Sequence, residues 1–226
     1  MPTALITGAS RGLGQALARR LARDGWTLII DAREEGPLAA TADELARHTT
    51  VHAIAGDVGA EAHRAALVKA AADVGGLDAL VHNASLLGPS PQPALVDYPL
   101  DTLRRVYEVN VFAPLRLTQM LTPHLHDGAR VIAVTSDAAV EDYAGWGGYG
   151  SSKAALEQVF AILAAEHPEL RVQRVDPGDM RTRMHAEAFP DEDISDRPPP
   201  EVSVPGLVAL LSGEYGSGRY RARDLA

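Results

Sequence analysis

Short apolar runs alternate with longer amphipathic segments along the whole chain. The longer segments are rich in Ala, Leu, Arg and Glu, and Leu13, Leu17 and Leu21 recur at the four-residue steps of one helix face. Continuous apolar runs are typical of strands that a parallel sheet buries on both faces. The expected strands are residues 3–7, 27–30, 51–55, 79–82, 130–135 and 171–175, with a last one at 218–222.

Strands that alternate with helices predict successive βαβ units and a parallel sheet covered on both faces. We therefore expect a doubly wound α/β fold of the Rossmann type, with a sheet of about seven strands. The chain has 226 residues, which suits one domain of this kind, and we assign residues 1–226 to it. In such sheets, ligands bind outside the carboxyl ends of the strands.

Two stretches interrupt this pattern. Residues 86–99 carry four prolines and predict a loop after the fourth strand. Residues 183–205 combine further prolines with the acidic run 191–193 and follow the sixth strand. A long irregular segment inside a compact domain is either disordered or a functional lid, and at the carboxyl edge of the sheet we expect a substrate lid at 183–205.

Composition excludes several classes of protein. The chain has no cysteine, so disulfides, thiolate catalysis and iron–sulfur ligation are excluded. Its net charge of −9 argues against a nucleic-acid partner. No apolar run approaches the ~18 residues of a membrane span, and the first residues lack a leader-like pattern, so we expect a cytoplasmic protein without membrane contact.

The segment TGASRGLG lies directly between the first strand and the first helix. Gly8, Gly12 and Gly14 fall within it. Glycines permit a tight turn and a close approach of the backbone to a ligand, and a helix N-terminus offers free N–H groups to phosphate. The spacing GxxxGxG differs from GxGxxG, but its context predicts a dinucleotide-phosphate turn. Domain 1–226 is thus expected to bind a dinucleotide as well as to carry the catalytic groups.

Tyr149 and Lys153 are four residues apart at the start of a helical segment and share one helix face. A nearby ammonium favours phenolate and lowers a tyrosine pKa, which would let Tyr149 exchange a proton. Lys69 is the only other lysine, so a chance pairing is improbable. Ser136, at the end of the fifth strand, could bond the same substrate oxygen, although serine at a strand end is often a turn or cap residue.

Taken together and in order, these residues resemble the short-chain dehydrogenase/reductase family over nearly the whole length. TGASRGLG matches the family's cofactor turn, and Asp57–Val58 matches its adenine-contacting pair. HNAS, residues 82–85, resembles its Asn-Asn-Ala-Gly segment, with His82 and Ser85 as departures. The remaining matches are the catalytic set Ser136, Tyr149, Lys153 and Asn110, and the nicotinamide-side loop with Pro177, Gly178 and Thr182.

The resemblance implies an oxidoreductase that transfers a hydride between NADP(H) and a carbonyl or alcohol. In that reading Tyr149 is the general acid, Ser136 polarises the carbonyl, Lys153 tunes Tyr149 and contacts the ribose, and Asn110 holds a relay water. The expected cofactor-binding residues are Gly8, Ser10, Arg11, Gly12, Leu13, Gly14, Arg33, Asp57, Val58, Asn83, Ala84, Tyr149, Lys153, Pro177, Gly178, Met180 and Thr182. A cofactor-retaining epimerase or dehydratase and a non-catalytic cofactor sensor are the alternatives on this scaffold.

The end of the second strand bears on cofactor choice. An NAD site needs a carboxylate there for the ribose hydroxyls, and the family's acidic position falls on Ala32. Arg33 follows, and with Arg11 it could grip a 2′-phosphate, so NADP is expected. Asp31 would favour NAD if the strand end shifted by one residue.

The remaining candidates have simpler interpretations. The eight histidines are scattered and are read as structural or solvated, with no metal site. Arg219, Arg221 and Arg223 are read as a charged sheet edge. Substrate contacts are expected from apolar and aromatic residues, Leu86, Leu87, Tyr143, Trp146 and Met184. The partners expected are a small carbonyl or alcohol substrate and a second copy of the chain, as a homodimer or other homo-oligomer.

Overall fold

The computed structural model describes residues 1–225. Its sheet has seven parallel strands in the order β3-β2-β1-β4-β5-β6-β7, which confirms the predicted doubly wound fold. The strands are β1 (Thr3–Ile6), β2 (Thr27–Ala32), β3 (Val51–Ala55), β4 (Leu77–His82), β5 (Leu125–Val134), β6 (Arg171–Asp176) and β7 (Gly218–Arg221). Residue 226, the last of the expected domain 1–226, lies outside the described residues.

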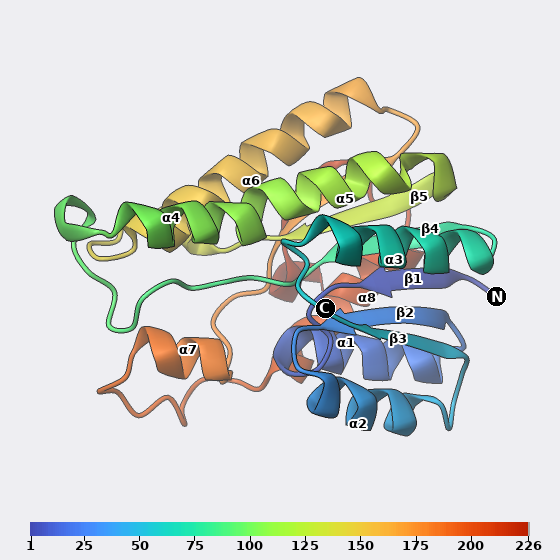
Figure 1. The fold of residues 1–226 in the computed structure, drawn as a ribbon, viewed down its shortest axis with the longest axis horizontal. Coiled ribbons are helices and arrows are strands. Elements are labelled where there is room, and N and C mark those ends of the chain that lie inside the picture. Colours follow the sequence, from blue (N-terminus) through green and yellow to red (C-terminus); the bar gives the residue numbers. More distant parts are fainter. Residues whose placement is uncertain (226) are drawn as a thin grey trace.

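Two layers of helices cover the sheet (Figure 1). One layer packs on the face that buries Ile6 and Ile30 and comprises α1 (Gly12–Arg23), α2 (Glu35–Leu45) and α8 (Val204–Ser212). The other packs on the face that buries Leu5 and Ile29 and comprises α3 (Glu61–Asp73), α4 (Leu100–Tyr107), α5 (Ala113–Leu121) and α6 (Gly147–Glu166). Side chains of successive strand residues point to opposite faces, so each strand supplies both cores.

The helix after the proline loop is not continuous. Between α4 and α5, the backbone of Glu108–Phe112 forms a π-helical turn, which contains the buried Asn110. The sequence predicted the helix but not this interruption. Such turns insert one residue into an α-helix and often occur at functional sites.

The chain order changes direction between β1 and β4, which lie side by side although two βαβ units separate them in sequence. The loops after these strands therefore diverge and leave a crevice at the carboxyl edge. A short helix, α7 (Arg183–Ala188), lies apart from both layers (Figure 1). The segment 183–205 is thus not irregular throughout, because the Thr182 hydroxyl caps α7 by accepting from the His185 N–H at 3.2 Å. Its expected role as a lid stays a prediction.

Candidate active site

The glycine turn between β1 and α1 packs directly against the residues that follow β4. Gly8 has φ +69°, and a Cβ there would lie 2.9 Å from the Ala84 Cα. A Cβ on Gly14 would lie 2.5 Å from the Gly8 carbonyl oxygen. Only glycine fits at these two positions, so the turn keeps its backbone N–H groups at the edge of the crevice.

Asn83 holds this turn from behind. Its side-chain amide donates to the carbonyl oxygens of Thr7, at 2.9 Å, and Gly8, at 3.0 Å. The Thr7 hydroxyl accepts in return from the backbone N–H groups of Asn83 and Ala84, both at 3.0 Å. Asn83 therefore locks the ends of β1 and β4 together while it lines the cavity.

A buried carboxylate lies beneath the same turn. One oxygen of Asp31 accepts from the Gly8 N–H at 2.7 Å, and the other is 3.0 Å from Nε2 of His63 on α3. The His63 ring fits because residue 56 is glycine: a Cβ there would lie 2.2 Å from His63 Nδ1. His63 was read as structural or solvated, and the scatter of the histidines gave no signal of this pairing. Both oxygens of Asp31 are thus engaged within the protein.

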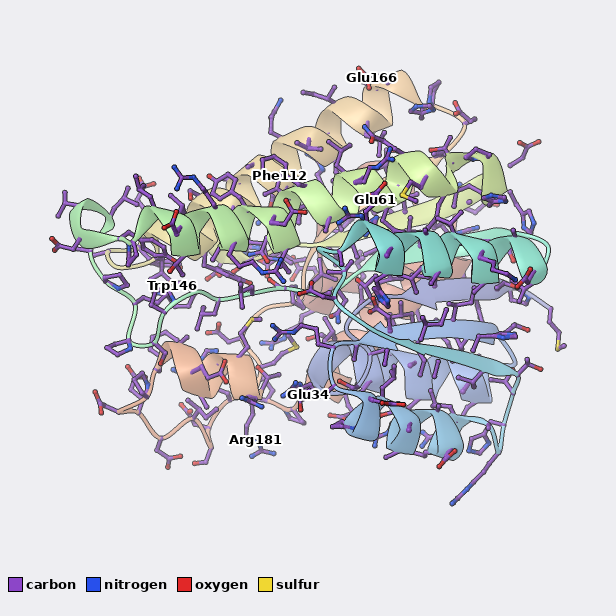
Figure 2. The ribbon with its side chains drawn as sticks, viewed as in Figure 1. Glu34, Glu61, Phe112, Trp146, Glu166 and Arg181 are labelled. Atoms are coloured by element: carbon purple, nitrogen blue, oxygen red, sulfur yellow. The ribbon has the colours of Figure 1, made fainter. Side chains whose placement is uncertain are left out.

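Exposed charges line the mouth of the crevice. Arg11, in the glycine turn, forms an ion pair with Glu34, and their side chains are 43% and 51% exposed. This pairing holds the pKa of the Glu34 carboxyl below its usual range. Arg33 lines the cavity, and its guanidinium has no carboxylate within ion-pair distance in residues 1–225. Figure 2 shows Glu34 at the start of α2 and Arg181 just before α7, both in the wall of the cavity.

Asp57 and Val58 are the pair expected to contact adenine, and that role stays a prediction. Both line the cavity after β3. One oxygen of Asp57 accepts from the Gly59 N–H at 2.8 Å, and the other pairs with Arg105 on α4. The Val58 carbonyl accepts from Arg64 at 2.7 Å. These contacts fix the loop after β3 against the helices beside it.

Tyr149 and Lys153 meet on the other side of the crevice, in the first two turns of α6. Tyr149 is 8% exposed and Lys153 2%. The Lys153 ammonium donates to the Val134 carbonyl at 2.8 Å and lies 5.5 Å from the centre of the Tyr149 ring. The pair thus occupies the geometry that the spacing predicted.

Burial dominates the proton equilibria of this pair. Burial lowers the pKa of Lys153 to about 7, because the ammonium loses its hydration, while Glu157 raises it. Burial also raises the pKa of the Tyr149 phenol, and hydrogen bonding with the Ser85 and Ser136 side chains lowers it. Lys153 was expected to lower the pKa of Tyr149. In the structure its ammonium bonds the Val134 carbonyl rather than the phenol oxygen, and burial raises the phenol pKa instead.

Ser136 follows β5, and its hydroxyl has the turn and cap role that is common for a serine at a strand end. Its hydroxyl donates to Asp137 Oδ1 at 2.8 Å and accepts from the Ala138 N–H at 3.2 Å, which caps a short 3₁₀ turn. The Ser136 side chain also lowers the pKa of the Tyr149 phenol, against the effect of burial. Its own turn therefore holds Ser136 in place, and the expected role of its hydroxyl toward a carbonyl oxygen stays a prediction.

Asn110 is engaged by protein on every side of its amide. Its nitrogen donates to the Leu86 carbonyl and to the Ser152 hydroxyl, both at 2.9 Å. Its oxygen accepts from the Leu86 N–H at 2.7 Å and from Ser85 Oγ at 3.2 Å. Asn110 thus ties the loop after β4 to α6, and its expected role of holding a water stays a prediction.

The predicted cofactor residues gather around one cavity of about 530 Å³. Gly14 packs behind the turn, Gly178 and Ser136 line a smaller cavity of about 100 Å³ next to it, and Asn110 supports the wall. The members that line the large cavity are Gly8, Ser10, Arg11, Gly12, Leu13, Arg33, Asp57, Val58, Asn83, Ala84, Tyr149, Lys153, Pro177, Met180 and Thr182.

The smaller cavity is the candidate substrate chamber, because both Ser136 and Tyr149 open into it. Leu87, Trp146 and Met184 line it as expected, whereas Leu86 lines the large cavity. Tyr143 stands outside the wall and bonds Asp137 at 3.1 Å. Trp146, which Figure 2 labels, packs on Tyr149 at 5.8 Å between ring centres and on Phe189 at 5.6 Å. Sequence reasoning missed Phe189, which has no pattern around it that would mark it.

The arginines in and just after the last strand do not form a uniform charged edge. Arg219 turns inward and pairs with Glu157 of α6, at 3.0 Å, and Arg223 donates to the Asp179 carbonyl. Arg221 is exposed, as expected. The expectation of an exposed charge was therefore wrong for Arg219, because α6 lies against the strand, whereas Arg223 is exposed but lies in the turn after β7.

The sequence led us to expect neither a membrane span nor a metal site. Over residues 1–225, none of the helices has the length and hydropathy to cross a membrane. In the same residues, His, Asp and Glu side chains form no group of three that could hold a metal ion.

The chain was compared with known proteins. The family model described as short chain dehydrogenase matches residues 2–193. The oxidoreductase YciK of Escherichia coli K12, itself uncharacterised, is 33% identical over 93% of this chain and 86% of its own length.

Solved structures agree. A family protein from Pseudomonas syringae is 33% identical, with a TM-score of 0.90 over 98% of this chain and 94% of its own. Another, from Shigella flexneri and in complex with NADP, is 30% identical, with a TM-score of 0.91 over 98% of this chain and 97% of its own. This oxidoreductase chain belongs to the short-chain dehydrogenase/reductase family.

Proposed function

We propose that the protein reduces a carbonyl compound with NADPH, and that Tyr149 is the proton donor. The observation that carries this proposal is the meeting of Ser136, Tyr149 and Lys153 beside the cavity that the glycine turn lines. A phosphate turn alone would serve a binding protein equally well. A buried phenol with a buried lysine over its ring serves proton transfer instead.

The cavity fits a dinucleotide. The glycine turn has no side chains where a Cβ would collide, and the N-terminus of α1 presents free N–H groups there, which favours a pyrophosphate. Asp57 and Val58 would face the adenine, and Pro177, Met180 and Thr182 the nicotinamide end. Bound NADPH would supply the hydride, so this chain supplies position and a proton.

The proton step follows from the burial of Tyr149. Its raised pKa keeps the phenol protonated near neutral pH, which is the form a general acid needs. As the carbonyl carbon gains a hydride, Tyr149 gives its proton to the carbonyl oxygen, and an alcohol forms. The Lys153 ammonium, 5.5 Å from the ring centre, stabilises the phenolate left behind. Ser136 would turn its hydroxyl from Asp137 to the same carbonyl oxygen.

The arrangement of charges supports NADP rather than NAD. The Asp31 side chain is 2% exposed, and its two oxygens are bonded to the Gly8 N–H and to His63, so this carboxylate is directed into the protein and has few acceptor sites left for ribose hydroxyls. Arg33 and Arg11 present guanidinium groups at the mouth, where a 2′-phosphate would lie. The related Shigella flexneri protein was found in complex with NADP.

The test is oxidation of NADPH with a panel of aldehydes, ketones and 3-oxo esters, followed by the absorbance of the reduced nicotinamide. We expect turnover with at least one apolar or aromatic carbonyl, since Leu87, Trp146 and Met184 line the smaller cavity. Lys153→Arg should abolish it, because a planar guanidinium does not fit a site sized for a buried ammonium. Lys69→Arg is the matched control, since Lys69 is 76% exposed and should keep full activity. Substrate conversion without net NADPH oxidation would indicate an epimerase or dehydratase instead.

A further inference from the structure

Three charged groups hold the end of β5, where the catalytic serine begins its turn. The Thr135 hydroxyl donates to Glu157 Oε1 at 2.8 Å, and the Ser136 carbonyl accepts from Arg219 at 3.3 Å. Glu157 lies on α6 and Arg219 on β7, and they pair with each other: Arg219 Nε lies 3.0 and 3.1 Å from the two Glu157 oxygens. Their side chains are 11% and 24% exposed, so water screens the pair little.

The same carboxylate lies one helical turn after the catalytic lysine. Lys153 and Glu157 are four residues apart on α6 and therefore share one face of the helix. Lys153 holds the preceding residue of the strand end through the Val134 carbonyl, at 2.8 Å. Lys153, Glu157 and Arg219 thus fix three consecutive residues, the last of β5 and the two that follow it.

Few other titratable groups face this cluster. On β6, Asp176 is 3.8 Å from the Arg219 guanidinium. On α6 itself the Tyr149 ring lies below the Lys153 ammonium. Asp137, after β5, acts on Tyr149, and His82, at the end of β4, packs on Phe160 of α6 and is held neutral by burial, which lowers its pKa to about 3. Glu157 is therefore the carboxylate whose charge acts on Lys153 most directly.

We propose that Glu157 and Arg219 are a positioning pair for the catalytic centre, which fixes Ser136 opposite Tyr149 and balances the charge on Lys153. What those three residues do rests on the proposed function. The placement of the pair does not depend on that function, because Glu157 and Arg219 contact the backbone and side chains at the end of β5 directly. The last strand of the sheet thereby takes part in the site through Arg219, although its edge faces away from the crevice.

The two members of the pair act on Lys153 in opposite directions. Glu157→Gln removes the negative charge that supports the ammonium, so the pKa of Lys153 should fall by about one unit. Arg219→Gln leaves Glu157 without its cation, so its full charge acts on Lys153 and the pKa should rise by about one unit. A merely structural contact would lower thermal stability in both variants and leave the lysine titration unchanged.

The chain suits a direct measurement, because Lys69 and Lys153 are its only lysines. Isotope-labelled lysine gives two ε-carbon signals in NMR, and each is followed against pH. Lys69, 76% exposed, provides the internal reference. Arg221→Gln, a neutral substitution on the same strand at an exposed position, is the matched control and should move neither signal. Opposite shifts of the Lys153 signal in the two variants support the proposal; equal pKa values in wild type and both variants overturn it.

Arg219→Lys covers the case in which Arg219→Gln does not fold. It keeps the positive charge, so the Lys153 titration should stay close to that of wild type, while the substituted residue adds a third ε-carbon signal. It loses the forked contact with the Ser136 carbonyl and Glu157, so kcat with NADPH should fall about tenfold with KM for NADPH little changed. Unchanged kcat would overturn the positioning role. A wild type that turns over no carbonyl refutes the proposed function instead, and the lysine titration still decides the charge balance.

Discussion

The two sides of the crevice hold charge in different ways. Beside β2 and β3, Arg11 and Glu34 pair in water, with side chains 43% and 51% exposed. Beside β5 and α6, Lys153 is 2% exposed and Tyr149 8%. Exposed pairs contribute little to stability and exchange partners easily, whereas buried groups shift their pKa values. The first side is therefore suited to recognising a ligand's charge, and the second to moving a proton.

The largest effect is expected from the buried side. Tyr149→Phe removes the transferable proton and leaves the ring packed on Trp146, so turnover should fall at least ~100-fold. Affinity for NADPH should stay within a few-fold, because the exposed side is untouched. Steady-state kcat and a fluorescence titration of NADPH measure the two quantities. Tyr215→Phe, whose ring packs on Tyr220 away from the crevice, is the control. Retention of more than about a tenth of the wild-type rate would show that another group donates the proton.

The exposed side should govern cofactor choice. We expect Arg33→Ala to lower the ratio of catalytic efficiencies for NADPH over NADH at least tenfold, with turnover at saturation preserved. Binding of 2′,5′-ADP, measured by calorimetry, should weaken in parallel. Arg23→Ala, an exposed arginine at the far end of α1, should change neither value. A wild type that prefers NADH would mean that Asp31 leaves His63 to bind the ribose.

A third prediction concerns a buried histidine on the catalytic side. Thr118 Oγ1 donates to the Pro114 carbonyl, so His82 Nε2 donates to Thr118, at 2.8 Å, and its Nδ1 has no hydrogen-bond partner among the described residues. Burial lowers the pKa of His82 from 6.5 to about 3. Below about pH 6.5 the unfolded chain binds the additional proton, so stability falls with acidity by roughly 1 kcal/mol per pH unit.

Urea unfolding between about pH 6.5 and about pH 5 measures this slope. His82→Asn should flatten it, and His48→Asn, at an exposed position, should not. An equal slope in wild type and His82→Asn would mean that His82 is already protonated in the folded protein.

The smallest effect is expected at α7 and the residues after it, which border the cavity. Arg183, Met184 and Glu187 of α7 line the cavity, and the Glu187 carbonyl accepts from Ser90 at 2.6 Å. Trypsin should therefore cut residues 183–205 several-fold more slowly when NADP and an unreactive substrate analogue are both present. Cleavage after the exposed Arg47 is the internal reference. Equal rates with and without ligands would make the segment a passive loop.

The sequence predicted what depends on local pattern. Apolar runs located all the strands to within a few residues, with β5 the least accurate because it begins at Leu125 rather than at residue 130. Tyr149 and Lys153 were placed correctly relative to each other because four residues on a helix fix their separation. Glycines in a strand–helix turn likewise have one steric reason to be there.

Contacts between distant elements could not be predicted in this way. Asp31 and His63 are 32 residues apart, and Glu157 and Arg219 are 62 apart. Each pair depends on which helix packs over which strand end, and neither leaves a periodic trace in the chain. The same holds for α7, whose cap at Thr182 is a single hydroxyl in a segment rich in proline.

The π-helical turn at Glu108–Phe112 has a consequence for redesign. One inserted residue rotates all later residues by roughly 100° about the helix axis. Leu117 and Leu121 of α5 therefore face the sheet, which they would not do if the helix continued from α4 without the insertion. Deleting a residue here would regularise the helix and turn that apolar face sideways. Asn110→Ala would raise helix propensity, yet it would strip the Leu86 N–H and carbonyl of their partner. A design algorithm that rewards ideal helices would thus remove the π-helical turn, although this turn places Asn110 against the loop after β4.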